Sequence, residues 1–401
     1  MILISAQPDV VYFHWQVELY MYQFSKHNIP NCHAVFGYVD QPSAKGLALS
    51  EKYPGHIHFY KDTRISSQKK YIPSIRPHIL KKFFRDFPEL GKEIFYHDSD
   101  IFLVSLPDFP SLLQDNFGYV SDTISYIGYN YLCGVSNRYK TKYPEIPDND
   151  LLHKMLELFE MDESLIQLNE PHSGGAQYLL KNVDSDYWEE VELKCNALYD
   201  LFKKYESTYP IEHHIQSWAT DMWCVLWTYW KQGNQTRVHK TLDFSWATSN
   251  TREYHEKNIF HLAGVTNTLE KTHFYKGNFC SKDLISEYRR NPSLLDYVSP
   301  TNATYEYIQV LKEYVGLSHA IPVKEINRFF LKTPNHYGDM YIKQTTIYFG
   351  RELWKSQSDE YIIFFNGTCW VLTSSKYESE ISETCGGYAS GHGEDPSQCN
   401  W

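Results

Sequence analysis

The chain has 401 residues and a formal net charge of −11 at pH 7. A negative charge of this size argues against a general nucleic-acid binder, because such proteins normally present a basic face to the phosphate backbone. Aromatic residues make up 16% of the chain and include 33 tyrosines and 10 tryptophans, which is enough to stack on sugars or nucleobases as well as to fill a core.

No apolar run approaches the length of a membrane-spanning helix, and the N-terminus lacks the basic and then apolar pattern of a signal peptide. We therefore expect a cytoplasmic protein without a transmembrane segment. The eight cysteines are scattered, and no pair has the spacing of a metal knuckle. The first five are expected to be reduced thiols, whereas Cys369, Cys385 and Cys399 would pair only in an oxidising compartment.

The first sixty residues alternate between the two kinds of secondary structure. Apolar runs of strand character cover 1–5, 32–39 and 56–60, and apolar residues recur at the helical period over 12–24 and 43–53. This βαβαβ order predicts a parallel sheet with helices on both faces.

A basic segment, 66–85, leads into an apolar and aromatic run, 93–103. The helix of the basic segment is expected to begin near Pro77, with Ser74 as its cap. In the run that follows, apolar and aromatic residues stand on both sides of two carboxylates, Asp98 and Asp100. It predicts a buried strand that delivers both carboxylates to its end.

Asp98 and Asp100 are two residues apart, so on an extended segment their side chains point the same way. Burial of unpaired carboxylates is very unfavourable, so the pair needs solvent, hydrogen bonds, a basic partner or a metal cation. Oxygen ligands favour Mg²⁺, Mn²⁺ or Ca²⁺. In open α/β sheets, ligands bind at the carboxyl ends of the strands, which is where this pair is predicted to lie.

The remaining pattern up to residue 295 continues the alternation. In chain order, we expect a strand at 118–120, a helix over 150–162 and a small-residue loop over 171–177. Helices over 187–205 and 211–229 and strands over 242–247 and 258–260 follow. The chain is expected to divide into a main domain, 1–295, a helical linker, 296–325, and a small β-rich module, 326–401, in which strands over 341–349, 361–365 and 368–373 are separated by Gly and Asn turns.

The opening strand, the βαβ series and residues 95–101 (FYHDSDI) resemble nucleotide-sugar glycosyltransferases of the GT-A fold. The resemblance implies a Rossmann-like α/β domain whose DxD motif, here Asp98-Ser99-Asp100, holds the divalent cation that bridges the diphosphate of the donor. It also implies a late histidine as the third metal ligand. His261, in His261-Leu262-Ala263-Gly264, matches that element, and His273 is its competitor.

The resemblance carries further expectations for the donor and the acceptor. Gly174 and Gly175 match the small-residue loop that lines the donor sugar, and Lys276 is a candidate for the phosphates. Asp221, between Trp218 and Trp223, is the candidate catalytic carboxylate, with Asp122 as the alternative. The other expected donor contacts are Gln7, Trp15, Lys70, Ser74, Arg76 and Ser99.

These observations predict a glycosyltransferase that uses Mn²⁺ or Mg²⁺ and moves a sugar from a nucleotide-sugar donor to a hydroxyl of a glycan or glycoprotein. Two alternatives from other classes remain. One is a non-catalytic carbohydrate-binding protein on a GT-A-like body, and the other is a metal-dependent phosphodiester or pyrophosphate hydrolase. Metal-dependent nucleotide binding separates the first alternative from the enzymes, and sugar transfer separates transferase from hydrolase.

Overall fold

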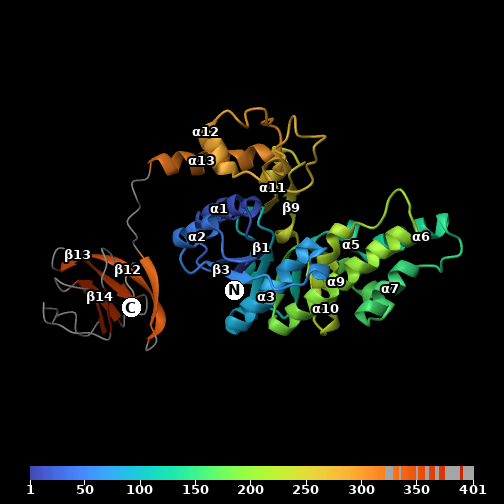
Figure 1. Cartoon of the computed structure of the whole chain (residues 1–401), viewed down its shortest axis with the longest axis horizontal. Helices are drawn as coiled ribbons and strands as arrows, with labels where there is room; N and C mark the ends of the chain where they lie inside the picture. Colours follow the sequence, from blue (N-terminus) through green and yellow to red (C-terminus); the bar gives the residue numbers. More distant parts are fainter. Residues whose placement is uncertain are drawn as a thin grey trace. The chain divides into compact units, whose positions relative to one another are not determined.

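The computed structural model describes residues 1–320, 328–333, 336–348, 351–356, 361–365, 370–374 and 389–391. The chain divides into two compact units, Met1–Ser318 and His319–Trp401. Figure 1 gives the elements of each unit along the chain.

The first unit is built on a seven-stranded sheet in the order β3-β2-β1-β4-β7-β6-β8. Its strands are β1 (Ile2–Pro8), β2 (Cys32–Tyr38), β3 (Ile57–Lys61), β4 (Glu93–His97), β6 (Gly118–Asp122), β7 (Gly174–Lys181) and β8 (Thr236–Val238). The sheet is parallel except at β7, which pairs antiparallel with both β4 and β6. The mixed α/β fold and the mostly parallel sheet confirm the expected fold class.

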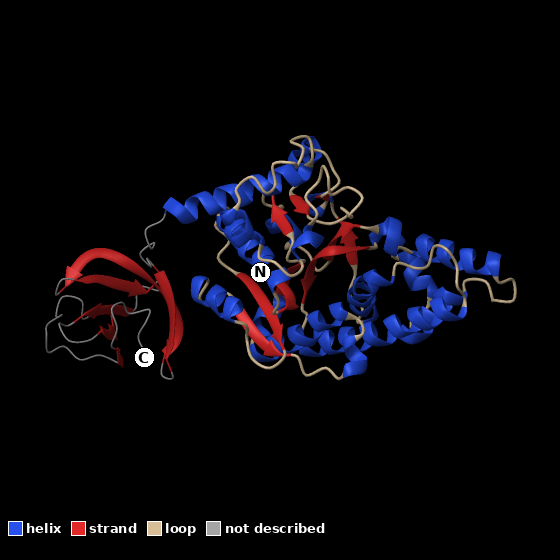
Figure 2. Cartoon of the chain, turned by 45° about the horizontal axis from the view of Figure 1, so that its top comes forward, coloured by secondary structure: helices blue, strands red, loops and turns tan. Residues whose placement is uncertain are grey.

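Helices cover both faces of this sheet (Figure 2). One face carries α3 (Ile75–Asp86), α6 (Tyr129–Lys142), α7 (Asp150–Phe159), α9 (Ser185–Thr208) and α10 (Thr220–Lys231). The other face carries α1 (Val11–Ser25), α2 (Ala44–Lys52), α12 (Leu284–Arg290) and α13 (Ala303–Ala320). Shorter helices are α4 (Phe109–Leu112), α5 (Ile124–Ile127), α8 (Glu163–Leu168) and α11 (Thr251–Glu256).

The two hydrophobic cores follow from the alternation of side chains along the strands. In β1, Ile2, Ile4 and Ala6 belong to the core under α3 and α9, whereas Leu3 belongs to the core under α1 and α13. Every one of these side chains is almost fully buried. The opening strand is therefore apolar on both faces, as a central parallel strand must be.

A second, three-stranded sheet, β5-β10-β9, explains how the carboxylate motif and the late histidine meet. The chain leaves β4 at His97, turns, and enters β5 (Ile101–Leu103), which pairs antiparallel with β10 (Ile259–His261). The third strand is β9 (Phe244–Trp246). The backbone N–H of Leu262 donates to the carbonyl of Asp100 at 2.9 Å. The pairing of β5 with β10 thus brings the end of β10 beside the turn between β4 and β5, although the two are far apart in sequence.

Several local expectations differ from the structure. Helix α10 begins at Thr220, nine residues after the expected start, and α6 was not expected at all. Helix α3 begins at Ile75, and the Ser74 side chain makes no capping hydrogen bond. The Ser74 hydroxyl donates instead to the carbonyls of Gln68 and Tyr71, because it lies inside a 3-10 turn, Ile72–Ser74, rather than at a free helix end.

The segment expected as a helical linker, 296–325, contains α13 (Ala303–Ala320). Its side chains Tyr307, Leu311 and Tyr314 are buried in the core beside α1. The Tyr314 hydroxyl also meets the buried Glu18 carboxylate of α1. The first compact unit accordingly ends at Ser318.

The described residues of the second unit form an antiparallel sheet in the order β11-β12-β13-β14-β15-β16. Its strands are β11 (Arg328–Thr333), β12 (His336–Tyr348), β13 (Arg351–Ser356), β14 (Tyr361–Phe365), β15 (Trp370–Ser374) and β16 (Ala389–Gly391). The expected β-rich module is confirmed. The expectations for Cys369, Cys385 and Cys399 fall outside the described residues.

The five cysteines of the first unit are free thiols, as expected. Within the part of the chain that the structure describes, none of the helices combines the length and the apolar composition that a bilayer crossing requires.

Candidate metal and nucleotide-sugar site

Three side chains meet where the large sheet passes into the small one. Asp98 and Asp100 lie in the turn between β4 and β5, and His261 ends β10. The His261 Nε2 atom lies 3.4 Å from Asp98 Oδ2 and 3.3 Å from Asp100 Oδ1. One potential ligand atom from each of the three lies within 4.8 Å of the others. Two carboxylates and an imidazole suit Mn²⁺ or Mg²⁺, so the residues present fit a divalent cation.

Two basic side chains flank this cluster, one on each carboxylate. Arg76 Nη1, at the start of α3, lies 2.8 Å from Asp98 Oδ1. The Lys276 ammonium forms an ion pair with Asp100 Oδ2. The two cations offset the charge of two carboxylates that are 5 to 22% exposed, which makes the burial of both tolerable. The Asp98–Asp100–His261 set with Arg76 and Lys276 is called the metal cluster below.

The protonation states follow from these neighbours. Burial acts to raise the pKa of Asp98 and Asp100, but Arg76, Lys276 and His261 outweigh it and hold both pKa values below the ordinary range. Burial lowers the pKa of His261, but the two carboxylates prevail and raise that pKa to about 9. Both carboxylates are therefore ionised at neutral pH, which is the state that ligates a cation. The imidazole must release its proton when a metal binds.

Two cavities meet at the metal cluster. The larger has a volume of about 600 Å³, and its walls include Tyr12, Gln16, Ser99, Asp100 and Lys276. The smaller has a volume of about 300 Å³, and its walls include Tyr96, Ala176, Tyr178, Asp221 and Met222. The residues common to both are Arg76, Asp98, Tyr126, Trp218, Trp246, His261 and Ala263. A ligand that occupies both cavities must pass the metal cluster.

Asp221, in the first turn of α10, faces the smaller cavity. Its carboxylate accepts hydrogen bonds from the Tyr71 hydroxyl at 2.7 Å and from Arg76 Nη1 at 3.1 Å. Burial raises its pKa, although Arg76 and Tyr71 oppose this. Arg76 thus bridges Asp221 and Asp98, which links the expected catalytic carboxylate directly to the metal cluster.

Aromatic side chains form much of the common wall. The Trp246 ring stacks on the His261 ring with centroids 6.0 Å apart, and the Tyr126 ring lies 5.9 Å from that of Trp218. Trp218 is 59% exposed, which is unusual for a tryptophan. These flat apolar surfaces suit the faces of sugar rings or a nucleobase.

Other expected site residues also line the cavities or adjoin them. Ser99 faces the larger cavity, where its hydroxyl donates to Gln16 Oε1 at 3.0 Å. Gly174 and Gly175 open strand β7, directly before Ala176 in the wall of the smaller cavity. A Cβ atom at Gly174 would overlap the Ser121 carbonyl, so the close pairing of β6 with β7 requires glycine there.

The remaining expected contacts lie elsewhere. Trp15 is fully buried and packs edge-to-face on Tyr12 and Phe274. The Gln7 amide donates to the Val35 carbonyl between β1 and β2. None of the other residues in this group lines either cavity; they are Lys70, Ser74, Asp122 and His273.

Their local contacts explain these positions. Asp122 Oδ1 accepts from the backbone N–H of Ile124 and so begins the short helix α5. The Lys70 side chain is 63% exposed, with Asp200 as an ion-pair partner at 4.0 Å. The imidazole of His273, half-buried, contacts the hydroxyl of Thr272.

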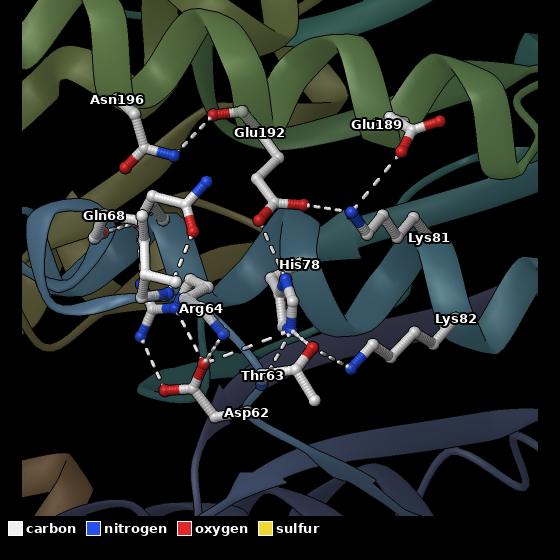
Figure 3. Close-up of polar contacts among 12 residues, drawn as sticks. Asp62, Thr63, Arg64, Gln68, His78, Lys81, Lys82, Glu189, Glu192 and Asn196 are labelled. Atoms are coloured by element: carbon white, nitrogen blue, oxygen red, sulfur yellow. Dashed lines mark hydrogen bonds and ion pairs between the residues drawn. The ribbon is translucent and has the colours of Figure 1, made fainter.

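A second cluster of buried charge, which includes Arg64, His78 and Glu192, lies between α3 and α9 (Figure 3). Ser74 joins it through a hydrogen bond from Arg64. Arg64 pairs with Asp62 through two N–H···O contacts of 3.0 and 3.1 Å, and it donates to the Ser74 hydroxyl at 2.6 Å. His78 Nδ1 lies 2.7 Å from Glu192 Oε1, and Lys81 Nζ lies 2.6 Å from Glu192 Oε2. This set, called the α3–α9 network below, fixes the segment that carries Tyr71 and Arg76.

Sequence patterns did not indicate Tyr71, Tyr126, Tyr178 or Trp246 as site residues. Each reaches the site through long-range packing. Tyr71, for example, contacts Asp221 across 150 positions of sequence. The high tyrosine and tryptophan content was the only available signal, and it does not say which rings face a cavity.

No model of a known protein family matches the chain, and no curated protein matches it. Among solved structures, it is similar to the galactosyltransferase LgtC in complex with donor and acceptor sugar analogues, at 12% identity and a TM-score of 0.34, over 66% of this chain and 87% of that one. It is similar to mouse xyloside xylosyltransferase 1, at 10% identity and a TM-score of 0.33, over 67% and 98% of the two chains.

A further similar structure is the bifunctional glycosyltransferase WbbM, at 10% identity and a TM-score of 0.37, over 74% of this chain and 51% of that one. All three likenesses are distant. Glycosyltransferases are thus the class of solved structures that this chain resembles, and the assignment of a function depends on the site itself.

Proposed function

We propose that this protein is a glycosyltransferase that moves a sugar from a nucleotide-sugar donor to a hydroxyl group of a glycan or glycoprotein, with Mn²⁺ or Mg²⁺ as its cation. One observation carries the proposal: Asp98, Asp100 and His261 converge within 4.8 Å beside two cavities, and Asp98 and His261 line both of them. A donor with a diphosphate between a nucleoside and a sugar has the same three-part layout.

Asp98, Asp100 and His261 would hold the cation. When bound, such a cation acts as a Lewis acid that stabilises the negative charge of a departing nucleoside diphosphate. Arg76 and Lys276 add two fixed positive charges at the same place, which favour a diphosphate over a neutral ligand.

The larger cavity suits the nucleoside, because Tyr12 and Phe13 offer rings and Gln16 offers an amide beside the carboxyl end of β1. Asp221 faces the smaller cavity, where its carboxylate can accept a hydrogen bond from a sugar hydroxyl. The Tyr71 and Arg76 hydrogen bonds hold this carboxylate in one orientation. The chain thus binds and orients both halves of the donor around one charged centre.

A thermal-shift panel tests the proposal. UDP, GDP, CMP and dTDP sugars are added with Mn²⁺ or with EDTA, because a ligand that binds the folded state raises its apparent stability. We expect at least one nucleotide to raise the unfolding midpoint with Mn²⁺ and not with EDTA. The Asp98→Asn/Asp100→Asn variant should lose this rise.

The same panel separates the alternatives. If no nucleotide stabilises the protein in the presence of Mn²⁺, the proposal fails and carbohydrate binding alone is the better account. Nucleotide stabilisation followed by release of free sugar, with no transfer to any glycan or glycoprotein acceptor, would identify a hydrolase.

A further inference from the structure

The smaller cavity contains a buried polar atom that the protein does not use. Tyr178, on β7, is 3% exposed and lines this cavity. Its hydroxyl has no hydrogen-bond partner among the residues that the structure describes. A buried hydroxyl without a partner lowers the free energy of unfolding, so a phenylalanine would serve the core better than a tyrosine at this position.

The surrounding chain makes room for this hydroxyl. A Cβ atom at Gly175 would overlap it, and would also meet the Met222 side chain. The ring of Tyr178 is fixed against the ring of Tyr96, with centroids 5.9 Å apart. Glycine at position 175 therefore leaves the hydroxyl free to face the cavity, which is what a ligand-binding group requires.

The position of the smaller cavity indicates which part of a donor it takes. It shares Asp98 and His261 with the larger cavity, so a diphosphate at the metal cluster would direct the nucleoside to one side and the sugar to the other. The smaller volume, about 300 Å³ against about 600 Å³, suits the sugar.

The charges of the wall restrict the kind of sugar. Arg76 is already paired with Asp98 and Asp221, and His261 with Asp98 and Asp100. Among the described residues of this wall, no cation is left for a sugar carboxylate, which would instead face the Asp221 carboxylate. A neutral sugar meets hydroxyl partners without this repulsion.

We propose that the smaller cavity binds the transferred sugar as a neutral hexose or pentose, and that the Tyr178 hydroxyl selects it by a hydrogen bond to one of its hydroxyl groups. This inference rests on the proposed function, since it assigns the sugar half of the donor. Tyr178 would thus determine sugar specificity. It belongs neither to the metal cluster nor to the candidate catalytic group, Asp221.

Titration calorimetry with Tyr178→Phe tests the inference. UDP and GDP are titrated with Mn²⁺, followed by UDP-glucose, UDP-galactose, UDP-xylose, UDP-glucuronate, GDP-mannose and the monodeoxy analogues of the sugar that binds best. We expect the wild type to bind one neutral sugar conjugate more tightly than the bare nucleotide and more tightly than UDP-glucuronate. Tyr178→Phe should lower the affinity for that conjugate about three- to tenfold, because one hydrogen bond is lost, and should leave the affinity for the bare nucleotide unchanged.

The deoxy analogues distinguish sugar recognition from a structural role, because a purely structural effect of Tyr178 would not change the preference between a sugar and its deoxy analogue. Wild type should discriminate against the analogue that lacks the contacted hydroxyl, and Tyr178→Phe should bind that analogue and its parent alike. The matched control is Tyr187→Phe, which removes a buried hydroxyl that donates to the Val225 carbonyl at 2.8 Å. The control should lower the unfolding midpoint without changing sugar preference, whereas Tyr178→Phe should leave the midpoint of the ligand-free protein unchanged or raise it.

The outcomes separate this inference from the proposed function. If a nucleotide binds with Mn²⁺ but Tyr178→Phe changes no sugar conjugate, or if UDP-glucuronate binds best, the inference is overturned and the proposed function stands. If no nucleotide binds, both fail. A lower midpoint for ligand-free Tyr178→Phe, with sugar preference intact, would show that the hydroxyl is structural and would also overturn the inference.

Discussion

Two clusters of buried charge in the described part of the first unit differ in their surroundings, because residues of the metal cluster line two cavities. In the α3–α9 network, Asp62 pairs with Arg64, and Glu192 pairs with His78 and Lys81 (Figure 3). In the metal cluster, Arg76 is shared by two carboxylates. The wall of the smaller cavity there also contains the Tyr178 hydroxyl, which has no hydrogen-bond partner among the described residues.

The contrast shows that buried charge alone does not identify a binding site. The α3–α9 network satisfies its charges internally, so its expected role is to stabilise one arrangement of the chain. The metal cluster places two carboxylates and an imidazole around one point beside open volume. Substitutions in the two clusters should therefore separate stability from ligand binding.

The largest expected effect is on turnover, at the cavity side. Asp221→Asn should reduce the rate of sugar transfer roughly 100-fold, the lower end for loss of a positioned catalytic carboxylate. Arg76 keeps Asp98 as a partner, so the fold should persist. Initial rates with saturating donor measure the change. Transfer within threefold of wild type would exclude Asp221 from the reaction, and Asp122→Asn, whose carboxylate begins α5, is the matched control.

The next largest effect is on stability and comes from a substitution in the α3–α9 network. Asp62→Asn leaves the buried Arg64 guanidinium without its charged partner and should lower the free energy of unfolding by about 3 kcal/mol. Urea unfolding followed by fluorescence measures this loss. Nucleotide affinity of the folded variant at low temperature should stay within twofold of wild type, and a loss of binding without a loss of stability would reverse the roles assigned to the two clusters.

A pair of partly buried histidines, His33 and His58, sharpens the comparison, because no carboxylate is paired with them among the described residues. His33 Nδ1 lies 3.0 Å from His58 Nε2. Burial, together with the neighbouring histidines, lowers the pKa of His33 to about 3 and that of His58 to about 4. The carboxylates around His261 have the opposite effect on its pKa.

The sign of the pH effect follows from these depressed pKa values. Between about pH 6.5 and pH 4 the unfolded chain takes up protons that the folded chain does not, so the free energy of unfolding falls as the pH falls. Between pH 7 and pH 5, the free energy of unfolding of His58→Gln should therefore fall by roughly 2 kcal/mol less than that of the wild type. Urea unfolding at both pH values measures this, and equal losses in variant and wild type would contradict it.

The smallest effect concerns a basic residue outside both clusters. Lys70→Ala should change the free energy of unfolding by less than about 0.5 kcal/mol, because its side chain is mostly exposed and its one ion-pair contact is long. Nucleotide affinity should also be unchanged. Calorimetry with UDP or GDP and Mn²⁺ checks this, and a loss of more than threefold would bring Lys70 into the donor site.

Local sequence pattern indicated the Asp98–Asp100 pair, and the resemblance to GT-A glycosyltransferases added His261 as a candidate third ligand. The alternation of strands and helices placed Asp98 and Asp100 at a strand end, and His261 follows a short apolar strand. The structure brings these three together through the pairing of β5 with β10. Arg76 and Lys276 were also expected near the donor, and they pair with Asp98 and Asp100.

Long-range packing decided the rest, and a local pattern does not contain it. Trp15 and Ser74 follow strands or begin helices as donor contacts often do, yet tertiary contacts bury one in the core and engage the other with Arg64. Tyr178 reads as one more apolar position in a buried strand. Its importance depends on Gly175 and Met222, which leave its hydroxyl facing a cavity.

The most direct test of the account is a Mn²⁺ titration followed by electron paramagnetic resonance, in which the signal of the free ion falls as it binds. With UDP or GDP present, wild type and Asp62→Asn should each bind one Mn²⁺ per chain, and Asp100→Asn should bind none at the same concentrations. Retention of Mn²⁺ by Asp100→Asn, or loss of it in folded Asp62→Asn, would contradict the assignment of the metal cluster.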